Sequence, residues 1–530
     1  MTYRVLATDK LAPQGVEIFK AAAPELEFDS KPGMPPEELA AVIGTYDALV
    51  IRSGTRVTAD ILREPGRLRV IGRAGIGVDN IDVATATKKG IVVMNTPGGN
   101  NVTTAEHTIT LMLSLARWIP QADASLHAGK WERTKFEGTE VCNKTLGVIG
   151  LGNIGAIVAE RAQGLRMKVI AFDPFITAEA AARMNVEVVT LDDLYARADF
   201  LTVHTPLTPE TRGLVNRTAI AKMKKGVRIV NCARGGIVDE QDLADAITSG
   251  HVAGAALDVF VDEPPPADHP LLRLPQVIAT PHLGASTSEA QVNVAVGIAE
   301  QVTKFLLRGE VESAVNMPSV SREMLALLRP HLLLGEKLGS LLGQLSPDAV
   351  AELAVEYSGQ VAELDWRPVT NAILRGLLSP FLDVAVNYVN APAIARERGI
   401  KVLESRASHS SAFVNSIKVS VARGGQRQVV EGAIFGNDIL RLVRINAFYL
   451  EAVPEGYILM LNNHDVPGVV GRVGTLLGAR GINIAGLELG REGAGGRAIS
   501  LFHVDHAVPE AVLEELRHAP DIISAQLLRL

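Results

Sequence analysis

The sequence predicts an α/β protein in which two doubly wound parallel-sheet domains precede an α+β region and a small β-α-β-β-α-β module. Short apolar runs alternate with helical segments over residues 4–93, and the alternation resumes more strongly from Thr145. Several runs are apolar throughout, which is typical of strands in a sheet that helices cover on both faces. Beyond Asn316 the pattern changes to a Leu-rich helix and hairpin-forming segments.

The first two regions are predicted to contain nine strands and two long helices. Thr103-Thr104-Ala105-Glu106 resembles a capping box, so a helix is expected to start there and to continue through His107–Trp118. A second helix, Ala285–Leu307, could lead the chain back to the first domain. The expected strands are Arg4–Thr8, Ala48–Arg52, Arg69–Gly72, Thr145–Ile149, Lys168–Phe172, Phe200–His204, Arg228–Asn231, Ala255–Val259 and Gln276–Thr280.

The last two regions have clear secondary-structure patterns, and the first of them, to about Pro454, shows no catalytic motif. A helix is predicted at Leu325–Leu345, a strand at Ala351–Gly359 and a hairpin at Phe413–Gly436. From Tyr457 onward, strand and helix patterns alternate in the order of a ferredoxin-like unit. The expected strands are Ile458–Leu461, Ile482–Leu489 and Ala498–Val504, and the expected helices are Gly468–Arg480 and Pro509–Arg517.

The composition is that of a soluble globular protein, with 47% hydrophobic and 21% charged residues among 530. The net charge of -7 is modest and argues against a general nucleic-acid binder. Two cysteines, Cys142 and Cys232, are too few for a disulfide framework and lack metal-ligand spacing. We expect no metal, no export signal, no membrane span and a cytoplasmic location.

A glycine-rich motif of the dinucleotide-binding type lies at Gly150-Leu-Gly152-Asn-Ile-Gly155. It follows an apolar strand and opens a predicted helix, Ile154–Gln163, and the next strand ends at Asp173. The glycines would let backbone N–H groups approach a pyrophosphate at the positive end of the helix. Asp173 would bind ribose hydroxyls and repel a 2′-phosphate, which favours NAD over NADP. A domain without a cofactor is the alternative interpretation.

A second glycine-rich run, Gly72–Asn80, is a poor pyrophosphate loop because the chain turns at Ile81-Asp82 before any helix. Two interpretations stay open for it. Backbone amides near Gly75 could bind a small anion such as a carboxylate, or the run could be a tight structural turn.

Three chemically useful side chains follow three predicted strands of the second region: Arg234, Glu263 and His282. Doubly wound sheets bind their ligands at such strand ends. Arg234 can bind a carboxylate through two hydrogen bonds, and His282 can take and return a hydroxyl proton. Glu263, if paired with His282, would orient the ring. Alone, each could be a surface or loop residue, but their joint placement predicts hydride transfer from a hydroxy acid.

At these residues the sequence resembles the D-isomer-specific 2-hydroxyacid dehydrogenase family, over about residues 1–317. The matching motifs are Leu146–Gly155 with Asp173, Met223–Glu240, Asp258–Pro264 and Pro281-His282. The resemblance implies that Arg234, Glu263 and His282 are catalytic, that NAD is the cofactor and that the substrate is a small molecule. It also implies a cofactor cleft lined by Gly150, Gly152, Asn153, Ile154, Gly155, Asp173, Thr205, Cys232, Ala233, Arg234, Asp258, His282, Gly284 and Ala285.

Within this family the chain resembles the long-form D-3-phosphoglycerate dehydrogenases. The resemblance rests on its length and on Val50–Ser53, Gly72–Gly75, Asn95–Pro97 and Gly129–Arg133. It implies that Arg52 and Arg73 hold a substrate phosphate. Ser53 and Gly75 are implied as further substrate-binding residues, and Arg133 and Lys135 as residues that reach the site of a neighbouring subunit.

The same resemblance implies how the chain divides into domains. A substrate-binding domain would use residues 1–98 and 286–317, around a Rossmann-type NAD-binding domain at 99–285. An α+β intervening domain would follow at 318–454 and a ferredoxin-like ACT regulatory domain at 455–530. Both N-terminal domains would be doubly wound, of Rossmann or flavodoxin-like type.

The predicted activity is oxidation of 3-phospho-D-glycerate to 3-phosphohydroxypyruvate with NAD, the first step of L-serine biosynthesis. One alternative is a glyoxylate or hydroxypyruvate reductase, a type of chain that usually ends near the end of the dehydrogenase portion. Another is a non-catalytic NAD-sensing regulator, against which the intact set of Arg234, Glu263 and His282 speaks.

The C-terminal module is predicted to bind L-serine as an effector. Asn463 and Asp465 follow its first strand, and Asn483 opens the second. In the ACT family, which this segment resembles, such positions of two facing modules enclose a free amino acid. The chain is therefore expected to form a homo-oligomer, a dimer at least and a tetramer for the long form. A helix-capping turn at Asp465–Gly468 is the alternative interpretation.

Overall fold

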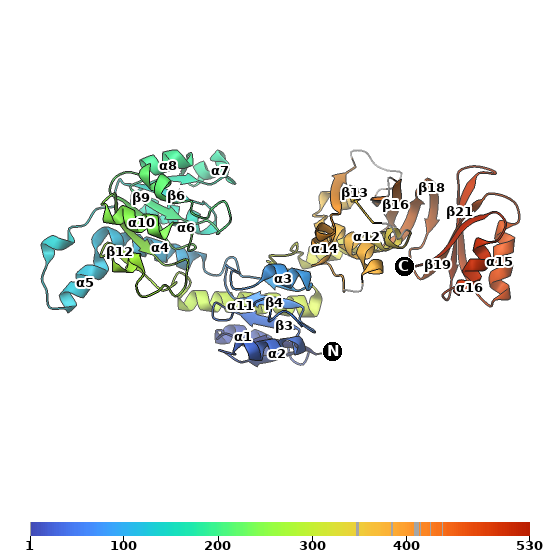
Figure 1. The fold of residues 1–530 in the computed structure, drawn as a ribbon, viewed down its shortest axis with the longest axis horizontal. Coiled ribbons are helices and arrows are strands. Elements are labelled where there is room, and N and C mark those ends of the chain that lie inside the picture. Colours follow the sequence, from blue (N-terminus) through green and yellow to red (C-terminus); the bar gives the residue numbers. More distant parts are fainter. Residues whose placement is uncertain are drawn as a thin grey trace.

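The computed structural model describes residues 2–345, 349–382, 385–407, 413, 415–423, 426–436 and 438–530. Four β-sheets follow one another along the chain. The molecule is elongated, with the second sheet at one end, the fourth at the other and the first between them (Figure 1). In the part of the chain that is described, no helix has both the length and the apolarity needed to cross a membrane.

The first sheet is parallel and has five strands in the order β2-β1-β3-β4-β5, which is the flavodoxin-like order. Helix α11 (Ser288–Arg308) returns from the second sheet and packs on α1 (Pro13–Ala21). A Cβ at Gly15 would lie 2.6 Å from the carbonyl oxygen of Ala295, so the two helices touch closely. The remaining elements are β1 (Tyr3–Ala7), β2 (Leu26–Ser30), α2 (Pro36–Val42), η1 (Ile43–Thr45), β3 (Ala48–Ile51), β4 (Val70–Arg73), α3 (Val83–Lys88) and β5 (Val92–Met94).

The second sheet is parallel and has seven strands in the order β12-β11-β10-β9-β6-β7-β8. The chain order reverses between β6 and β9, which is the switch point where such sheets bind ligands. The strands are β6 (Thr145–Ile149), β7 (Lys168–Phe172), β8 (Glu187–Val188), β9 (Phe200–Val203), β10 (Val227–Asn231), β11 (Val252–Leu257) and β12 (Val277–Ala279).

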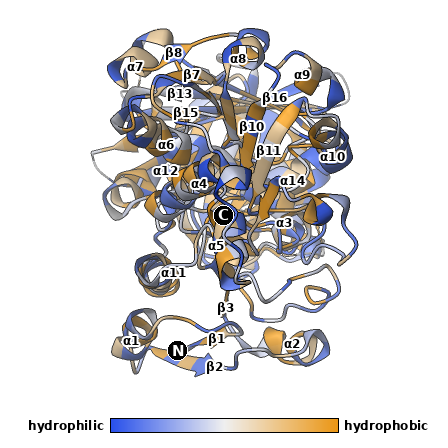
Figure 2. Ribbon diagram, turned by 90° about the vertical axis from the view of Figure 1, so that its left-hand side faces the viewer, coloured by the Kyte–Doolittle hydropathy of each residue, from blue (hydrophilic) through white to orange (hydrophobic). Residues whose placement is uncertain are grey.

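Helices bury both faces of the second sheet. Ile229 belongs to one hydrophobic cluster and its neighbour Val230 to another, so consecutive side chains of β10 enter opposite layers. Figure 2 shows the hydrophobic residues of β10 and β11 between the surrounding helices. These helices are α4 (Asn101–Arg117), α6 (Asn153–Gly164), α7 (Ala178–Arg183), α8 (Leu191–Arg197), α9 (Arg217–Ala221) and α10 (Glu240–Thr248); α5 (Ile119–His127), η2 (Arg133–Phe136) and η3 (Pro270–Arg273) lie in connections.

The predicted capping box is wrong. Helix α4 begins at Asn101, so Thr103 and Glu106 lie inside it, and the N-cap residue Asn100 makes no side-chain capping bond. Glu106 instead pairs with Arg161 of α6 at 3.2 Å. The Thr104 hydroxyl bonds to the carbonyl oxygen of Asn100 at 3.0 Å. Such a bond to the preceding turn satisfies a threonine within a helix, so the sequence pattern alone does not fix the start.

The third sheet is mixed and has the order β14-β13-β15-β16-β17-β18, in which only β13 and β14 are parallel. Strands β15 and β16 form the predicted hairpin, of which residues 414 and 424–425 lie outside the described residues. The other elements are α12 (Arg322–Leu345), β13 (Glu352–Ser358), η4 (Gly359–Glu363), α13 (Arg367–Leu378), η5 (Ser379–Phe381), α14 (Ala391–Glu397), β14 (Lys401–Arg406), β15 (Ser416–Arg423), β16 (Gln426–Phe435), β17 (Ile439–Ile445) and β18 (Phe448–Ala452).

The fourth sheet is antiparallel with the order β20-β21-β19-β22, which confirms the ferredoxin-like unit. Leu459 of β19 and Leu477 of α15 are fully buried in its core. The elements are β19 (Tyr457–His464), α15 (Val469–Ala479), β20 (Ile484–Arg491), β21 (Arg497–Val504), α16 (Glu510–Arg517) and β22 (Ile522–Arg529).

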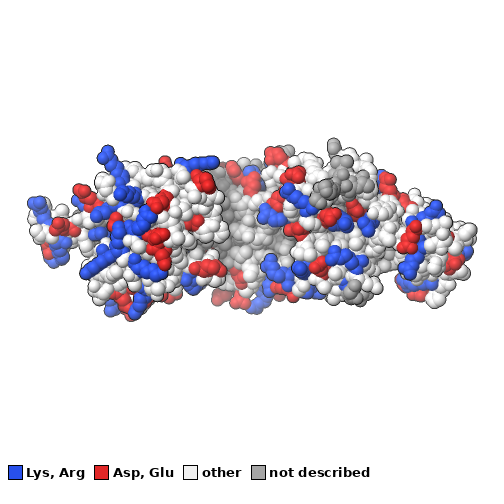
Figure 3. All heavy atoms as spheres, turned by 90° about the horizontal axis from the view of Figure 1, so that it is seen from above, with Lys and Arg blue, Asp and Glu red and all other residues white. Residues whose placement is uncertain are grey.

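Polar contacts join the third domain to the first domain on one side and to the fourth sheet on the other. Asn387 donates to the carbonyl oxygen of Gly90 at 2.9 Å, and Glu397 of α14 pairs with Lys88 of α3 at 2.7 Å. At the other end, the Gln344 side chain bonds to both the N–H and the carbonyl of Arg529 in β22. Acidic and basic side chains are interspersed on the face shown in Figure 3. Exposed pairs of this kind contribute little stability, so the buried clusters carry most of it.

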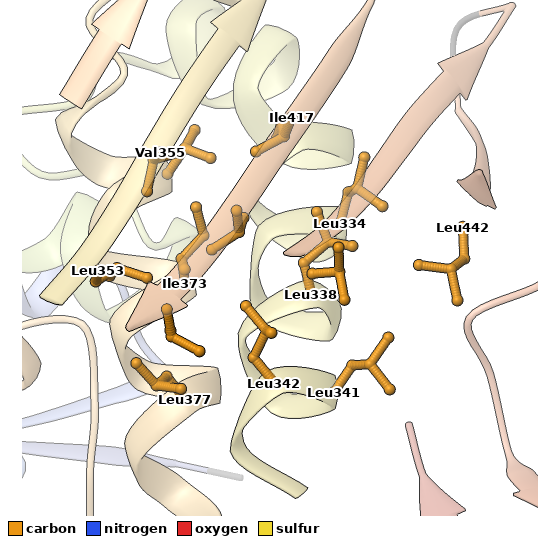
Figure 4. Packing of buried hydrophobic residues seen from close by; sticks show 14 of the residues in the cluster. Leu334, Leu338, Leu341, Leu342, Leu353, Val355, Ile373, Leu377, Ile417 and Leu442 are labelled. Carbon is orange, nitrogen blue, oxygen red and sulfur yellow. The ribbon is translucent and has the colours of Figure 1, made fainter. Parts of the chain in front are cut away.

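Helices α12 and α13 pack together over the third sheet and fill its core with leucines (Figure 4). Glycines permit this approach. A Cβ at Gly339 would lie 2.1 Å from the carbonyl oxygen of Ile373, and one at Gly376 would lie 2.1 Å from that of Glu336. The backbone of a facing helix cannot move aside as a side chain can. The short distance between the axes of α12 and α13 therefore requires glycine at these positions.

Gly339→Ala should therefore destabilise the third domain by about 1–3 kcal/mol, because overpacking outweighs the gain in helix propensity. Differential scanning calorimetry would show its transition at a lower temperature. Gly478→Ala in α15 is the matched control, since a Cβ there meets open space. It should leave stability unchanged or raise it by about 0.5–1 kcal/mol. A Gly339→Ala protein that unfolds at the wild-type temperature would contradict this packing.

Candidate active site

The candidate active site lies at the carboxyl ends of the strands in the second sheet and in loops of the first. Arg234 follows β10, Asp258 follows β11 and His282 follows β12. Parallel strands end at the same edge of a sheet, so residues far apart in sequence gather there. A cavity of ≈ 400 Å³ at this edge is lined by Asp258, Phe260, Glu263, Pro264, Pro265, Leu272, Ala279, Thr280, Pro281 and His282.

His282 and Glu263 form the predicted pair. Nδ1 of His282 lies 2.7 Å from Oε2 of Glu263, and both side chains remain partly exposed. Oε1 of Glu263 accepts from the N–H of Phe260 at 3.1 Å. Burial raises the pKa of Glu263, but the hydrogen bond and charge of His282 outweigh it, so the net pKa is below the usual range. Because Nδ1 is engaged, Nε2 is the nitrogen left for a substrate proton.

Asp258 fixes the loop that carries His282. Its carboxylate is buried and accepts from the N–H groups of Leu283 and Gly284, each at 2.7 Å, while its carbonyl accepts from the N–H of His282. Burial raises its pKa, but the bonds from His107, Thr280 and Leu283 hold the pKa below the usual range. His282 has φ of +54°, which is uncommon for a residue other than glycine. The Asp258 contacts hold this conformation in place.

Arg52 and Arg73 lie at the ends of β3 and β4, on the side of the first sheet. Burial and then the positive charge of Arg234 lower the pKa of Arg73 to about 10. Arg52 also lowers this pKa, while Asp79 and Asp9 raise it, so Arg73 is repelled by two neighbouring guanidiniums. The buried Nε of Arg52 has no hydrogen-bond partner within the described residues. Three neighbouring cations with an unpaired donor form a site for a strongly negative group.

The loop between β4 and α3 supports the turn interpretation at Gly75, and anion binding by this loop stays a prediction. Gly75 has φ of +151°, and its N–H donates to the Thr96 hydroxyl at 2.8 Å, so this amide serves the turn. Ser53 is exposed beside Arg52. The Gly75 and Ser53 assignments stay predictions, and the amides of Ile76 and Gly77 are the better candidates for an anion.

The dinucleotide loop has the geometry that a pyrophosphate needs. Gly150 has φ of +90°, and its Cβ would lie 2.7 Å from the carbonyl oxygen of His204. A Cβ at Gly155 would lie 2.0 Å from the carbonyl oxygen of Gly150. Around Gly152, in contrast, a Cβ would meet open space. Gly152 is the N-cap residue of α6, so Asn153 and Ile154 present free backbone amides to this space at the positive helix end.

Asp173 and Thr205, which the sequence predicts to bind the cofactor, flank this loop. The carboxylate of Asp173 accepts from the N–H of Leu151 at 2.8 Å, so it also shapes the loop. Thr205 follows β9, and its buried hydroxyl oxygen has no partner among the described residues. Burial lowers the pKa of the adjacent His204 to about 4, so its ring is neutral at physiological pH. An orphaned hydroxyl and an open glycine cradle fit a bound dinucleotide.

The remaining predicted cofactor contacts lie at the same sheet edge. Ala233 accepts from Arg234 at 2.7 Å, and Gly284 accepts from Thr104 at 2.9 Å, with Ala285 next in the chain. Burial raises the pKa of the Cys232 thiol to about 12, so this cysteine is a packing residue and not a nucleophile.

Two predicted groups lie away from this edge. Arg133 and Lys135 are in η2 beyond α5; Lys135 lies 3.6 Å from Glu132, and no contact joins either residue to the cleft of its own chain within the described residues. In the last module Asn463 is buried, accepting from Ser500 and donating to the carbonyl of His464. Asp465 pairs with Arg491 at 3.3 Å, and the exposed Asn483 donates to Asp505.

Sequence reasoning missed several residues that support the site. His107 lies 3.2 Å from the carboxylate of Asp258, Asp79 pairs with Arg234 at 2.9 Å, and Asn80 accepts from Arg73 at 3.1 Å. A signal existed for each. His107 is the one histidine of helix α4, and Asp79-Asn80 directly follow the glycine-rich turn.

Comparison with known proteins places the chain in a family. Residues 109–284 match the model described as D-isomer specific 2-hydroxyacid dehydrogenase, NAD binding domain. Residues 327–446 match the D-3-phosphoglycerate dehydrogenase intervening domain, and 457–520 match the ACT domain. A D-3-phosphoglycerate dehydrogenase of Bacillus subtilis is 43% identical over 528 residues, which is 100% of both chains. One of Methanocaldococcus jannaschii is 44% identical over 99% of this chain and 100% of its own.

The chain belongs to the D-3-phosphoglycerate dehydrogenase family. The family assignment makes NAD the cofactor of the glycine-rich loop described above. Solved structures resemble its dehydrogenase portion. A glyoxylate reductase from Paecilomyes thermophila (TM-score 0.55, 29% identity) covers 59% of this chain and 98% of its own. A D-lactate dehydrogenase from Aquifex aeolicus, complexed with NAD and lactic acid (TM-score 0.52, 26% identity), covers 60% of this chain and 100% of its own.

For a D-3-phosphoglycerate dehydrogenase of this geometry, His282→Ala should lower turnover by about 10²–10⁴-fold, because the proton acceptor is lost. Glu263→Gln should move the acid limb of the pH–rate profile to lower pH. An amide carries no charge and does not stabilise a positively charged imidazole as a carboxylate does. NAD affinity, measured by fluorescence titration, should stay near wild type in both variants. Near-normal turnover of His282→Ala would remove this residue from the mechanism.

Proposed function

We propose that the chain oxidises 3-phospho-D-glycerate to 3-phosphohydroxypyruvate with NAD, in the first step of L-serine biosynthesis. The observation that carries the proposal is the group formed by Arg52, Arg73 and Arg234, together with the His282–Glu263 pair at the carboxyl edge of the second sheet. One cation suffices for a hydroxy-acid carboxylate, whereas a phosphate needs the other two. Full-length relatives named D-3-phosphoglycerate dehydrogenase support the same substrate.

Each group of the site then has one task. Arg234 binds the substrate carboxylate, and Arg52 and Arg73 bind the phosphate. Nε2 of His282 takes the hydroxyl proton, while Glu263 holds the ring through Nδ1 and balances the charge that forms. NAD, when bound along the loop at Gly152, supplies the acceptor for the hydride that leaves the carbinol carbon. Asp258 holds the loop that carries His282, and so keeps the His282 ring in position to take the hydroxyl proton.

Two other activities are outcomes of the same turnover assay. A glyoxylate or hydroxypyruvate reductase would turn over the unphosphorylated acids better than 3-phosphoglycerate. A non-catalytic NAD-sensing regulator would bind NAD without turnover of any of them. The glyoxylate reductase neighbour corresponds to only 59% of this chain, so the two C-terminal domains favour the phosphoglycerate activity.

Arg52→Ala should lower kcat/KM for 3-phosphoglycerate by about 10–100-fold, which corresponds to the loss of a charge-assisted hydrogen bond of roughly 1.5–3 kcal/mol. Glycerate, which lacks the phosphate, should lose much less. Arg56→Ala is the matched control, since Arg56 is exposed and four residues further along. Equal losses for both substrates would show that Arg52 does not read the phosphate.

We further propose that L-serine is an effector that binds between two copies of the last module. The carboxylate of Asp465 can bind the amino group of serine, and the amide of Asn483, just before β20, can donate and accept hydrogen bonds. Both side chains are accessible. Asn463 is a weaker candidate, because its buried amide already has partners on both sides. Serine would act by binding one arrangement of the oligomer more tightly than another.

A homo-oligomer, a tetramer for this long form, is part of the proposal, as is a cytoplasmic location. Helix α5 has no buried residue, and Ile119, Leu126 and Trp131 around it are 54%, 58% and 77% exposed. This apolar segment extends from the end of the molecule in Figure 1, a position suited to covering by a second subunit. Arg133 and Lys135, just beyond it, would then be near the neighbouring site.

Millimolar L-serine should lower the initial rate of the wild type and raise its melting temperature, because a ligand stabilises the state that it binds. Asp465→Ala should lose both responses. Asp521→Ala, which removes a partner of Arg472 on the same module, serves as the control. A wild type indifferent to serine in both measurements would reject the effector, and unchanged inhibition of Asp465→Ala would place serine elsewhere.

A further inference from the structure

Asp79 joins the two N-terminal domains through the guanidinium of Arg234. Arg234 follows β10 of the second sheet, and Asp79 lies in the loop after β4 of the first. Nε of Arg234 donates to Oδ2 of Asp79 at 2.9 Å, across 155 residues of sequence. In the proposed function Arg234 binds the substrate carboxylate. A contact that fixes its guanidinium therefore also fixes the orientation in which the carboxylate is bound.

The loop is shaped to receive this side chain. A Cβ at Gly77 would lie 2.0 Å from Nη2 of Arg234 and 2.7 Å from Oδ2 of Asp79, so a larger residue would separate the pair. Asn80, next to Asp79, donates to the carbonyl oxygens of Arg52 and Thr55 at 2.7 Å and 2.6 Å. Asp79 is therefore presented from a loop that is anchored to the end of β3.

The contact with Asp79 uses the Nε side of the Arg234 guanidinium and leaves its terminal nitrogens available for another partner. Nη1 donates one hydrogen to the carbonyl oxygen of Ala233 at 2.7 Å. Within the described parts of the chain, Nη2 has no hydrogen-bond partner. The edge formed by the two terminal nitrogens can then bind a carboxylate with two parallel hydrogen bonds.

Stability is not the main consequence of this pair. The side chain of Asp79 is 70% exposed and that of Arg234 is 30% exposed. Ion pairs with this much solvent around them contribute little to folding. A guanidinium on a flexible stem nevertheless loses much of its freedom when one edge is tied, and orientation of this kind is worth most in the reacting complex.

We propose that Asp79 is a positioning residue that holds Arg234 across the cleft, with its terminal nitrogens directed at the substrate carboxylate. When the two domains approach, Asp79 contacts Arg234, and the same contact completes the site for the carboxylate. The inference rests on the proposed function for the identity of the hydroxy acid, whereas the contact between Asp79 and Arg234 is independent of it.

The test is a double-mutant cycle on kcat/KM for 3-phosphoglycerate. Asp79→Ala should lower it about 10–100-fold, mainly through a higher KM for the acid, with the KM for NAD unchanged. Asp79→Asn should recover most of the loss, because its amide oxygen can still accept from Nε. In an Arg234→Ala background, Asp79→Ala should cause almost no further loss. Asp60→Ala, an exposed aspartate of the same domain that pairs with Arg63, is the control.

Hydrogen–deuterium exchange of the enzyme without ligands gives a second measurement. Asp79→Ala should raise exchange in residues 75–80 and 233–236 and leave the core strands unchanged. Wild-type kcat/KM in Asp79→Ala, or an equal loss in the Arg234→Ala background, would overturn the proposal. Absence of wild-type turnover with 3-phosphoglycerate would reject the proposed function instead, and the exchange data would still decide whether the contact orders both segments.

Discussion

The common edge at which parallel strands end is the constraint on which the whole site depends. In the second sheet it brings Gly150, Thr205, Arg234, Asp258 and His282 together, although they follow five different strands. In the first sheet the same rule places Arg52 and Arg73 at neighbouring strand ends. Asp258 then converts this coarse placement into a fixed geometry, because its buried carboxylate accepts from two backbone N–H groups of the His282 loop and its carbonyl oxygen accepts from a third. The site is thus a consequence of strand ends and loops that two sheets contribute.

The sequence predicts this edge well because strands and strand ends are local patterns. Apolar runs locate β6, β9 and β10, and each located strand also identifies the residues at its carboxyl end. In the first two sheets, the strands that escaped prediction are β2, whose five residues include three polar ones, and the short β5 and β8. The pair of His282 and Glu263 is predictable because both follow adjacent strands. The contact of Asp79 with Arg234 is not, because it depends on how two domains approach.

Polar contacts connect the fourth sheet to the third domain and the third domain to the first. Gln344 bonds to the last strand of the fourth sheet, and Asn387 donates to the carbonyl oxygen of Gly90, two residues after α3 in the first domain. Helix α3 begins directly after the loop that carries Asp79. A change in how the C-terminal domains pair would therefore reach the substrate loop through packed elements. Coupling of this kind requires that an effector favour one of two arrangements by its differential affinity.

The central claim is that the phosphate and carboxylate of one substrate bridge the two domains. A crystal structure of the dead-end complex with NADH and 3-phosphoglycerate tests it most directly. The account predicts a phosphate between Arg52 and Arg73, a carboxylate on the terminal nitrogens of Arg234, and a hydroxyl about 3 Å from Nε2 of His282. A phosphate bound away from both arginines, or a hydroxyl beyond the reach of His282, would contradict it.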